Sequence, residues 1–166
     1  MAQELLLEQL KIMGFEPVRI DDGRYLFEYK EMKYLLRTDD DNEKFLSISI
    51  PVFDEITENN KMTVYETVNI INSLVRYVKM IIKEENVSVV YEHRLADNDD
   101  LEELLENIIQ ALSTALSLYI KKMRGDKIPY LDYDPKEDVV ETEDSMCDSD
   151  IELESELAKL LDNIDD

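Results

Sequence analysis

Reactive side chains other than carboxylates are scarce in this sequence of 166 residues. It contains one histidine, His93, and one cysteine, Cys147. A zinc site needs several closely spaced ligands, and no second His or Cys lies near His93 in the sequence. Acidic neighbours of Cys147 disfavour the thiolate, which makes it a poor nucleophile. We therefore expect a structural role for His93 and no catalytic, cofactor-binding or metal-binding residues, and we predict that the protein is not an enzyme.

The acidic residues form no recognisable ligand pattern. The run DDDNE at 39–43 contains side chains that bind calcium, but an EF-hand loop needs Gly at position six and Glu at position twelve. Counted from Asp39, those positions hold Lys44 and Ile50, so a turn is the better interpretation. With 40 acidic residues, carboxylates come close by chance, and no acid–base pair can be singled out.

The charge of the chain restricts its partners. Its 18 basic and 40 acidic residues give a net charge of −22, which repels nucleic-acid phosphates and anionic membrane surfaces. No apolar stretch is long enough to span a membrane without a charge, and Glu4 and Glu8 interrupt the first apolar run, unlike a secretory signal. We expect no nucleic-acid partner, no membrane partner and a cytoplasmic protein, to which a single cysteine is also suited.

Hydrophobic periodicity predicts one α+β domain, with an antiparallel sheet of about five strands packed by helices. Asp22-Gly23 is a tight-turn signal, Pro51 is expected to end a strand or to lie at a sheet edge, and Thr63 with Glu66 forms a capping box. The predicted order is α-β-β-β-β-α-β-α: a helix over 3–13, strands between 17 and 53, a helix over 63–84, a strand over 86–95 and a helix over 99–124.

The composition changes after Gly125. Residues 126–166 hold 16 acidic and 3 basic side chains, a net charge of −13. We predict a domain over 1–125 and an acidic tail over 126–166, mostly extended or disordered, that ends in a short amphipathic helix. The stripe expected to dock this helix comprises Leu153, Leu157, Leu160, Leu161 and Ile164.

A second candidate site lies on the predicted helix 63–84. A helical wheel places its polar residues opposite the apolar arc. On composition this is a solvated face; alternatively it is a docking face for a client protein or for the chain's own acidic tail. The candidate partner-binding residues are Tyr65, Asn69, Asn72, Arg76, Lys79 and Lys83.

The order of elements over residues 3–124 resembles the YbjN family, whose fold is that of the type III secretion chaperones. The family's Asn-x-x-Asn signature is matched by Asn69-Ile70-Ile71-Asn72, and its following basic residue by Arg76 or Lys79. The resemblance implies helices on one side of an antiparallel sheet, a homodimer, and the binding of extended client segments without ATP. The tail has no counterpart in this resemblance.

Two functions of different kinds follow. The first is a non-enzymatic protein-binding module, chaperone-like or regulatory, that binds a client by strand addition or in an apolar groove. In this hypothesis the tail helix is either an internal ligand or a solubilising extension. The alternative is an acidic mimic that regulates a basic nucleic-acid-binding protein.

Overall fold

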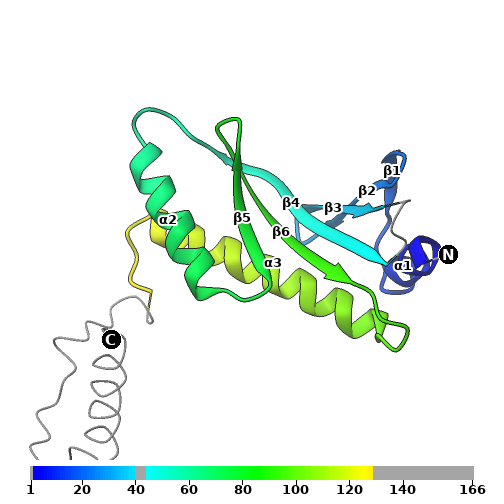
Figure 1. Cartoon of the computed structure of the whole chain (residues 1–166). Helices are drawn as coiled ribbons and strands as arrows, with labels where there is room; N and C mark the ends of the chain where they lie inside the picture. The colour runs from blue at the N-terminus through cyan, green and yellow to red at the C-terminus, as the bar shows by residue number, and fades with distance from the viewer. Residues whose placement is uncertain (1, 40–43, 129–166) are drawn as a thin grey trace, which may run out of the picture. The chain divides into compact units, whose positions relative to one another are not determined.

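The computed structural model describes residues 2–39 and 44–128 of the chain, and residues 1, 40–43 and 129–166 lie outside this description. The described residues form three helices and six strands (Figure 1). In chain order these are α1 (Ala2–Ile12), β1 (Val18–Asp21), β2 (Arg24–Tyr29), β3 (Met32–Thr38), β4 (Phe45–Glu55), α2 (Lys61–Leu74), β5 (Val78–Lys83), β6 (Asn86–Arg94) and α3 (Leu101–Met123).

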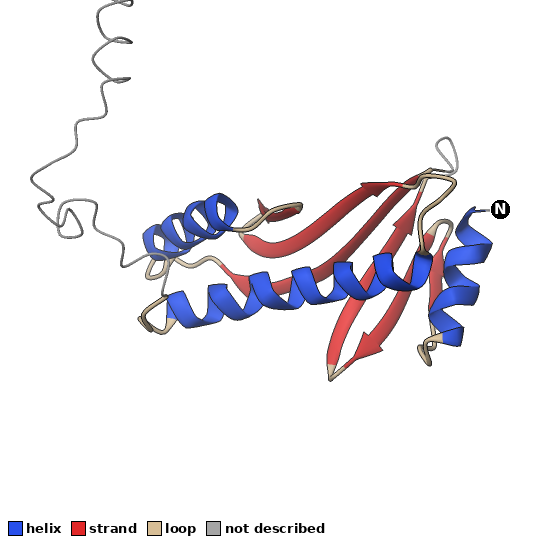
Figure 2. Cartoon of the chain, turned by 90° about the horizontal axis from the view of Figure 1, so that it is seen from below, coloured by secondary structure: helices blue, strands red, loops and turns tan. Residues whose placement is uncertain are grey.

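All six strands join one antiparallel sheet with the order β1-β2-β3-β4-β6-β5. The helix α3 lies along one face of this sheet, with α1 near one of its ends and α2 near the other (Figure 2). The predicted α+β class and its antiparallel sheet are confirmed. None of the helices within the described ranges is both long and apolar enough to cross a membrane.

The core lies between α3 and the covered face of the sheet. Alternate strand residues point into it, because successive side chains of a strand lie on opposite faces. The helix contributes residues at helical spacing, which is why its apolar stripe faces the sheet. Core residues with at most 2 % exposure include Leu36, Leu46, Ile48, Ile50, Val87, Val89, Leu105, Ile108 and Leu112.

The predicted helix over 63–84 is wrong in its second half. The helix α2 ends at Leu74, and residues 78–83 form the additional strand β5. Val78 and Met80 are buried while Lys79 and Ile81 are exposed, which is the two-residue period of a strand. A short run of Val, Ile and Met satisfies helix and strand periods alike, so periodicity alone does not distinguish them.

The predicted start of α2 and the predicted role of Pro51 also need correction. The helix starts at Lys61, so Thr63 and Glu66 lie inside it and do not form a capping box. Pro51 lies within β4, a central strand that continues to Glu55. The pairing of β4 with β6 is irregular between Ile50 and Asp54, and such an irregularity accommodates a residue without an N–H group.

The predicted boundary at residue 125 is not tested. The first compact unit of the chain runs from Met1 to Ile128, and Ile128 is buried. Because residues 129–166 lie outside the described part, the division into a domain over 1–125 and a tail over 126–166 stays a prediction.

The two-residue loop between β5 and β6 has residues that do not favour its backbone conformation. Glu84 and Glu85 have φ angles of +50° and +65°, in the left-handed region that Asn and Gly adopt at lower cost. We expect Glu84→Asn with Glu85→Gly to raise the free energy of unfolding by about 1–2 kcal/mol. Urea denaturation measures this, and an unchanged midpoint would contradict it. Neither residue lines the groove beside α3, so the groove should be unchanged in this variant.

Candidate functional site: a groove beside α3

The helix α3 forms one wall of the candidate site and is fixed at both ends. At its N-terminus Asp100 Oδ1 accepts hydrogen bonds from the backbone N–H groups of Glu102 and Glu103, at 3.1 and 3.2 Å. Near its C-terminus the Tyr119 hydroxyl donates to Asp54 Oδ2 on β4 at 2.6 Å. Burial and this hydrogen bond raise the pKa of Tyr119 well above that of an ordinary tyrosine. A hydrogen bond as well as side-chain packing therefore holds α3 against the sheet.

The histidine lies on β6 and contacts the loop before α3. Asp99 Oδ2 accepts from the backbone N–H of Ala96 at 2.8 Å and lies 3.0 Å from His93 Nε2. The Ala96 hydrogen bond, followed by the contact with His93, lowers the pKa of Asp99. His93 thus has a partner within the fold, in agreement with the structural role expected for it. Among the described residues, no cluster of three or more His, Cys, Asp or Glu side chains is placed to hold a metal ion.

The opposite wall is aromatic. The backbone N–H of Phe15, just after α1, donates to Leu10 O at 2.9 Å, which places the Phe15 ring beside the β2–β3 hairpin. Its centroid lies 5.4 Å from that of Phe27 and 5.5 Å from that of Tyr29. Phe27 in turn stacks on Tyr34 at 5.3 Å. The segment after α1 and the strands β2 and β3 therefore build one aromatic surface that faces α3.

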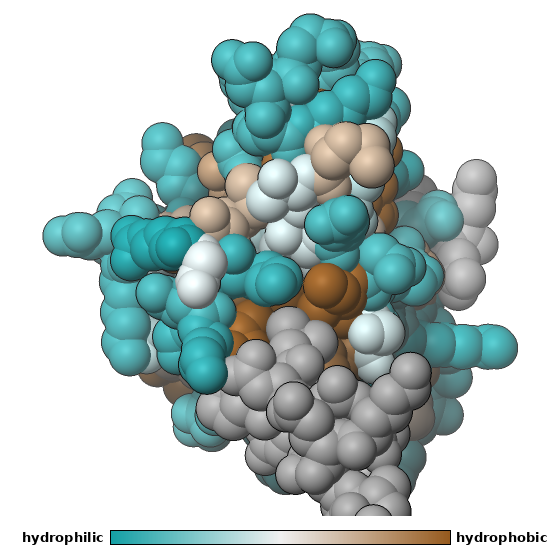
Figure 3. Space-filling model, turned by 90° about the vertical axis from the view of Figure 1, so that its left-hand side faces the viewer, coloured by the Kyte–Doolittle hydropathy of each residue, from teal (hydrophilic) through white to brown (hydrophobic). Residues whose placement is uncertain are grey.

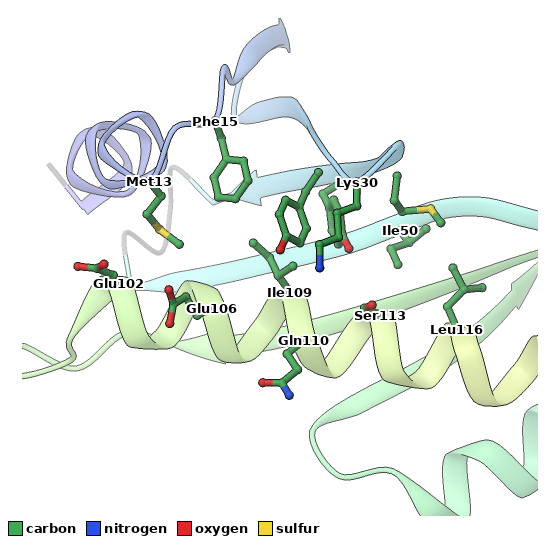
Figure 4. A pocket seen from close by; sticks show the side chains of 13 residues that line it. Met13, Phe15, Lys30, Ile50, Glu102, Glu106, Ile109, Gln110, Ser113 and Leu116 are labelled. Atoms are coloured by element: carbon green, nitrogen blue, oxygen red, sulfur yellow. The ribbon is translucent and has the colours of Figure 1, made fainter. Parts of the chain in front are cut away.

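A groove of about 660 Å³ lies between these two walls (Figure 4). Apolar side chains and polar groups contribute about equally to its exposed lining. The apolar lining comprises Met13, Phe15, Tyr29, Met32, Tyr34, Ile50, Ile109 and Leu116, and the polar lining comprises Lys30, Glu102, Glu106, Gln110 and Ser113. A concave surface that combines apolar side chains with polar groups is suited to ligand binding.

The groove offers aromatic, cationic and acidic groups to a ligand. Burial raises the pKa of the Tyr34 hydroxyl, so this group stays neutral near pH 7. Lys30 Nζ lies 5.0 Å from the centre of the Tyr29 ring, a cation–π contact. The lining contains no Cys and no His, and thus neither a thiolate nucleophile nor an imidazole base.

The six residues predicted to bind a partner do not share one helix face, because the helix ends at Leu74. The first three lie on α2, the fourth in the following turn and the last two on β5: Tyr65, Asn69, Asn72, Arg76, Lys79 and Lys83. Lys79 pairs with Glu92 at 2.8 Å. Figure 3, which views the molecule from the α2 side, shows a mainly hydrophilic surface. A role of these residues in partner binding stays a prediction.

Asn72 has a clear partner within the fold. Its Nδ2 donates to Met80 O at 3.2 Å, and the backbone N–H of Met80 donates to Asn72 Oδ1 at 2.7 Å. Met80 lies on β5, an edge strand whose other side pairs with β6. The side-chain amide therefore occupies the position of a neighbouring strand. Asn69 is exposed, and its side chain forms no hydrogen bond with any described residue.

The residues predicted to dock the tail helix all lie outside the described residues, so their docking stays a prediction. They are Leu153, Leu157, Leu160, Leu161 and Ile164. The sequence analysis expected an apolar groove as one of two binding modes, but it predicted neither the position of this groove nor its lining residues. Its available signals were Phe15 directly after a helix and the alternation of Phe27 and Tyr29, but these do not show which helix faces them.

No protein-family model matches this sequence, and no curated protein does. Solved structures do match. YbjN from E. coli aligns with a TM-score of 0.56 and 10% identity over 76% of this chain and 95% of that chain. The Yersinia pestis type III secretion chaperone SycH, in complex with a stable fragment of YscM2, aligns with a TM-score of 0.50 and 16% identity over 71% and 99% of the two chains.

A third match is the ExsC–ExsE complex, with a TM-score of 0.50 and 13% identity over 73% of this chain and 90% of the matched one. Identities this low establish the likeness of fold alone. The fold implied by the sequence resemblance is confirmed. The chain has the α+β fold shared by YbjN and the type III secretion chaperones.

Proposed function

We propose that this chain is a non-enzymatic protein-binding module, chaperone-like or regulatory, that holds a segment of a client protein in the groove beside α3. The observation that carries the proposal is the groove itself: about 660 Å³, with aromatic and aliphatic side chains from the segment after α1, the β2–β3 hairpin, β4 and α3. Aromatic side chains in a concave surface provide a large contact area at low entropic cost, which favours protein–protein recognition.

The shared fold supports a protein ligand over a small molecule. A groove of this volume suits either. Two proteins of the same fold were crystallised with protein partners, SycH with a fragment of YscM2 and ExsC with ExsE. The proposal also includes a homodimer that acts in the cytoplasm. Met62, Tyr65 and Tyr77, with exposures of 69%, 42% and 77%, are candidate residues for a dimer interface.

The net charge of −22 supports the alternative function, an acidic mimic of nucleic acid for a basic protein. The two functions differ in their salt dependence. Contacts between exposed charges are screened within about 3 Å at 1 M salt, whereas apolar burial is not weakened. Partners retained through a wash at high salt therefore indicate the groove.

Filling the groove tests the proposal. Ser113 lines the groove and is exposed, so Ser113→Tyr is expected to place a ring inside it with a change in stability within about 0.5 kcal/mol. We expect recovery of client proteins from native cytoplasm to fall about tenfold or more, which corresponds to about 1.4 kcal/mol of binding free energy. Quantitative mass spectrometry of captured proteins measures this.

The matched control is Ser117→Tyr, which makes the same substitution one turn later on α3, at an exposed residue outside the groove lining. This variant should retain the wild-type partners. If Ser113→Tyr captures the same proteins in the same amounts, the groove is not the binding site.

A further inference from the structure

The charges at the edge of the groove specify the chemistry of its ligand. From the groove geometry, and resting on the proposed function, we infer that the client segment carries apolar side chains next to lysine or arginine. The apolar residues occupy the space between Phe15 and Ile109, and the cation lies against Glu102 and Glu106.

Two carboxylates face the groove without a partner. Glu102 and Glu106 lie one turn apart on α3, and their side chains rise on the groove side of the helix (Figure 4). Both are exposed, and neither forms an ion pair with any described residue. Like charges four residues apart destabilise a helix, and a cation between them would remove that cost.

The position of Glu106 has no explanation within the helix. An acidic residue in the first turn, such as Glu102, complements the helix dipole. Glu106 lies beyond that turn, where the dipole has little effect. Its side chain forms no ion pair with any described residue, so nothing that the structure describes compensates its charge.

Lys30 does not neutralise the two carboxylates. It lies on the hairpin wall, over the Tyr29 ring, and forms no ion pair among the described residues. The groove thus has an acidic edge on α3 and one cation on the opposite wall. A bound segment is oriented by this asymmetry, with its basic residue at the α3 edge.

The same charges disfavour the chain's own tail as the occupant. Residues 126–166 have a net charge of −13, the same sign as the α3 edge. A segment with this charge is repelled by Glu102 and Glu106, whereas a basic client is attracted to them. The overall charge of −22 also increases the rate at which basic partners arrive.

A charge swap tests the inference. The full-length protein, immobilised by biotin on Cys147, is used to select from a display library of random peptides. Wild type is expected to enrich peptides with Lys or Arg next to aromatic or aliphatic residues. With Glu102→Lys and Glu106→Lys, the ratio of basic to acidic residues in the selected peptides should fall about tenfold. Sequencing of the selected pools measures this ratio.

A double variant with the same change in net charge controls for long-range attraction. Glu66→Lys with Glu103→Lys alters two exposed glutamates outside the groove, and its pool should keep the basic preference. An equal shift with both double variants would overturn the inference, since net charge would then explain it. The inference also fails, while groove binding stands, if the charge-swapped groove still selects basic peptides. A wild-type pool no different from the Ser113→Tyr pool would overturn the proposed function as well.

Discussion

Asn72→Leu is expected to lower the free energy of unfolding by about 2–3 kcal/mol, with little change in side-chain volume. The substitution removes both hydrogen bonds to Met80, whose backbone N–H and C=O then have no partner. Met80 is 4% exposed, so water does not easily replace the lost groups. Each neutral hydrogen bond contributes about 1 kcal/mol, and an unsatisfied buried group costs a further amount of similar size.

The expected effect is large because of where β5 lies. An edge strand presents unpaired backbone groups, and a folded protein must cover them or risk pairing with another chain. The Asn72 side chain covers the backbone N–H and C=O of Met80. The same two hydrogen bonds hold the C-terminal turn of α2 against the sheet. Aggregation of Asn72→Leu at high concentration is a consistent second observation.

Asn69→Leu is the matched control, since Asn69 lies one turn earlier on α2 and is exposed. Its effect should remain within about 0.5 kcal/mol. Urea denaturation measures both variants, and hydrogen exchange at the Met80 amide should accelerate only in Asn72→Leu. Equal stabilities for the two variants would show that the Asn72–Met80 contact contributes nothing.

This contact also shows the limits of prediction from the sequence. The helical wheel placed Asn69 and Asn72 together on a polar face, which is right for the part of the helix that exists. The side-chain partner of Asn72 lies on a strand that the wheel treated as more helix. Because Val, Ile and Met suit both periods, the turn at residues 75–77 leaves no clear signal in the sequence. Tyr77 has a φ angle of +65°, at which glycine is the usual residue, so no glycine marks this turn in the sequence.

Other parts of the fold could be predicted from the sequence because their signals are local. Asp22-Gly23 forms the turn between β1 and β2, and Gly125, with a φ angle of +78°, follows the end of α3. The position of the groove could not be predicted, because residues 13–15, the β2–β3 hairpin, β4 and α3 all line it, and α3 is far from the others in the sequence. Phe15 and Ile109 each look like ordinary core residues, and only the spacing between the segment after α1, the hairpin and α3 makes them part of a groove.

Tyr119→Phe is expected to lower the free energy of unfolding by about 1.5–3 kcal/mol near pH 7, the usual value of a hydrogen bond to a charged group. The ring is 2% exposed and keeps its edge-on contact with Phe53 in the variant. What is lost is the bond to Asp54, which leaves a partly buried carboxylate without that donor. Tyr65→Phe, at an exposed tyrosine on α2, is the control and should change stability by less than about 0.5 kcal/mol.

The pH dependence separates this hydrogen bond from packing. Since the fold raises the pKa of Tyr119, the native state keeps its proton while the unfolded chain loses it above pH 10. The stabilisation is complete below pH 10 and declines as the pH rises towards the folded value, so wild type and Tyr119→Phe should converge. Tyr34 and Tyr91 also have raised pKa values, but they are present in both proteins and cancel in the difference. A difference that stays constant from pH 7 to about pH 11 would assign the effect of Tyr119 to packing.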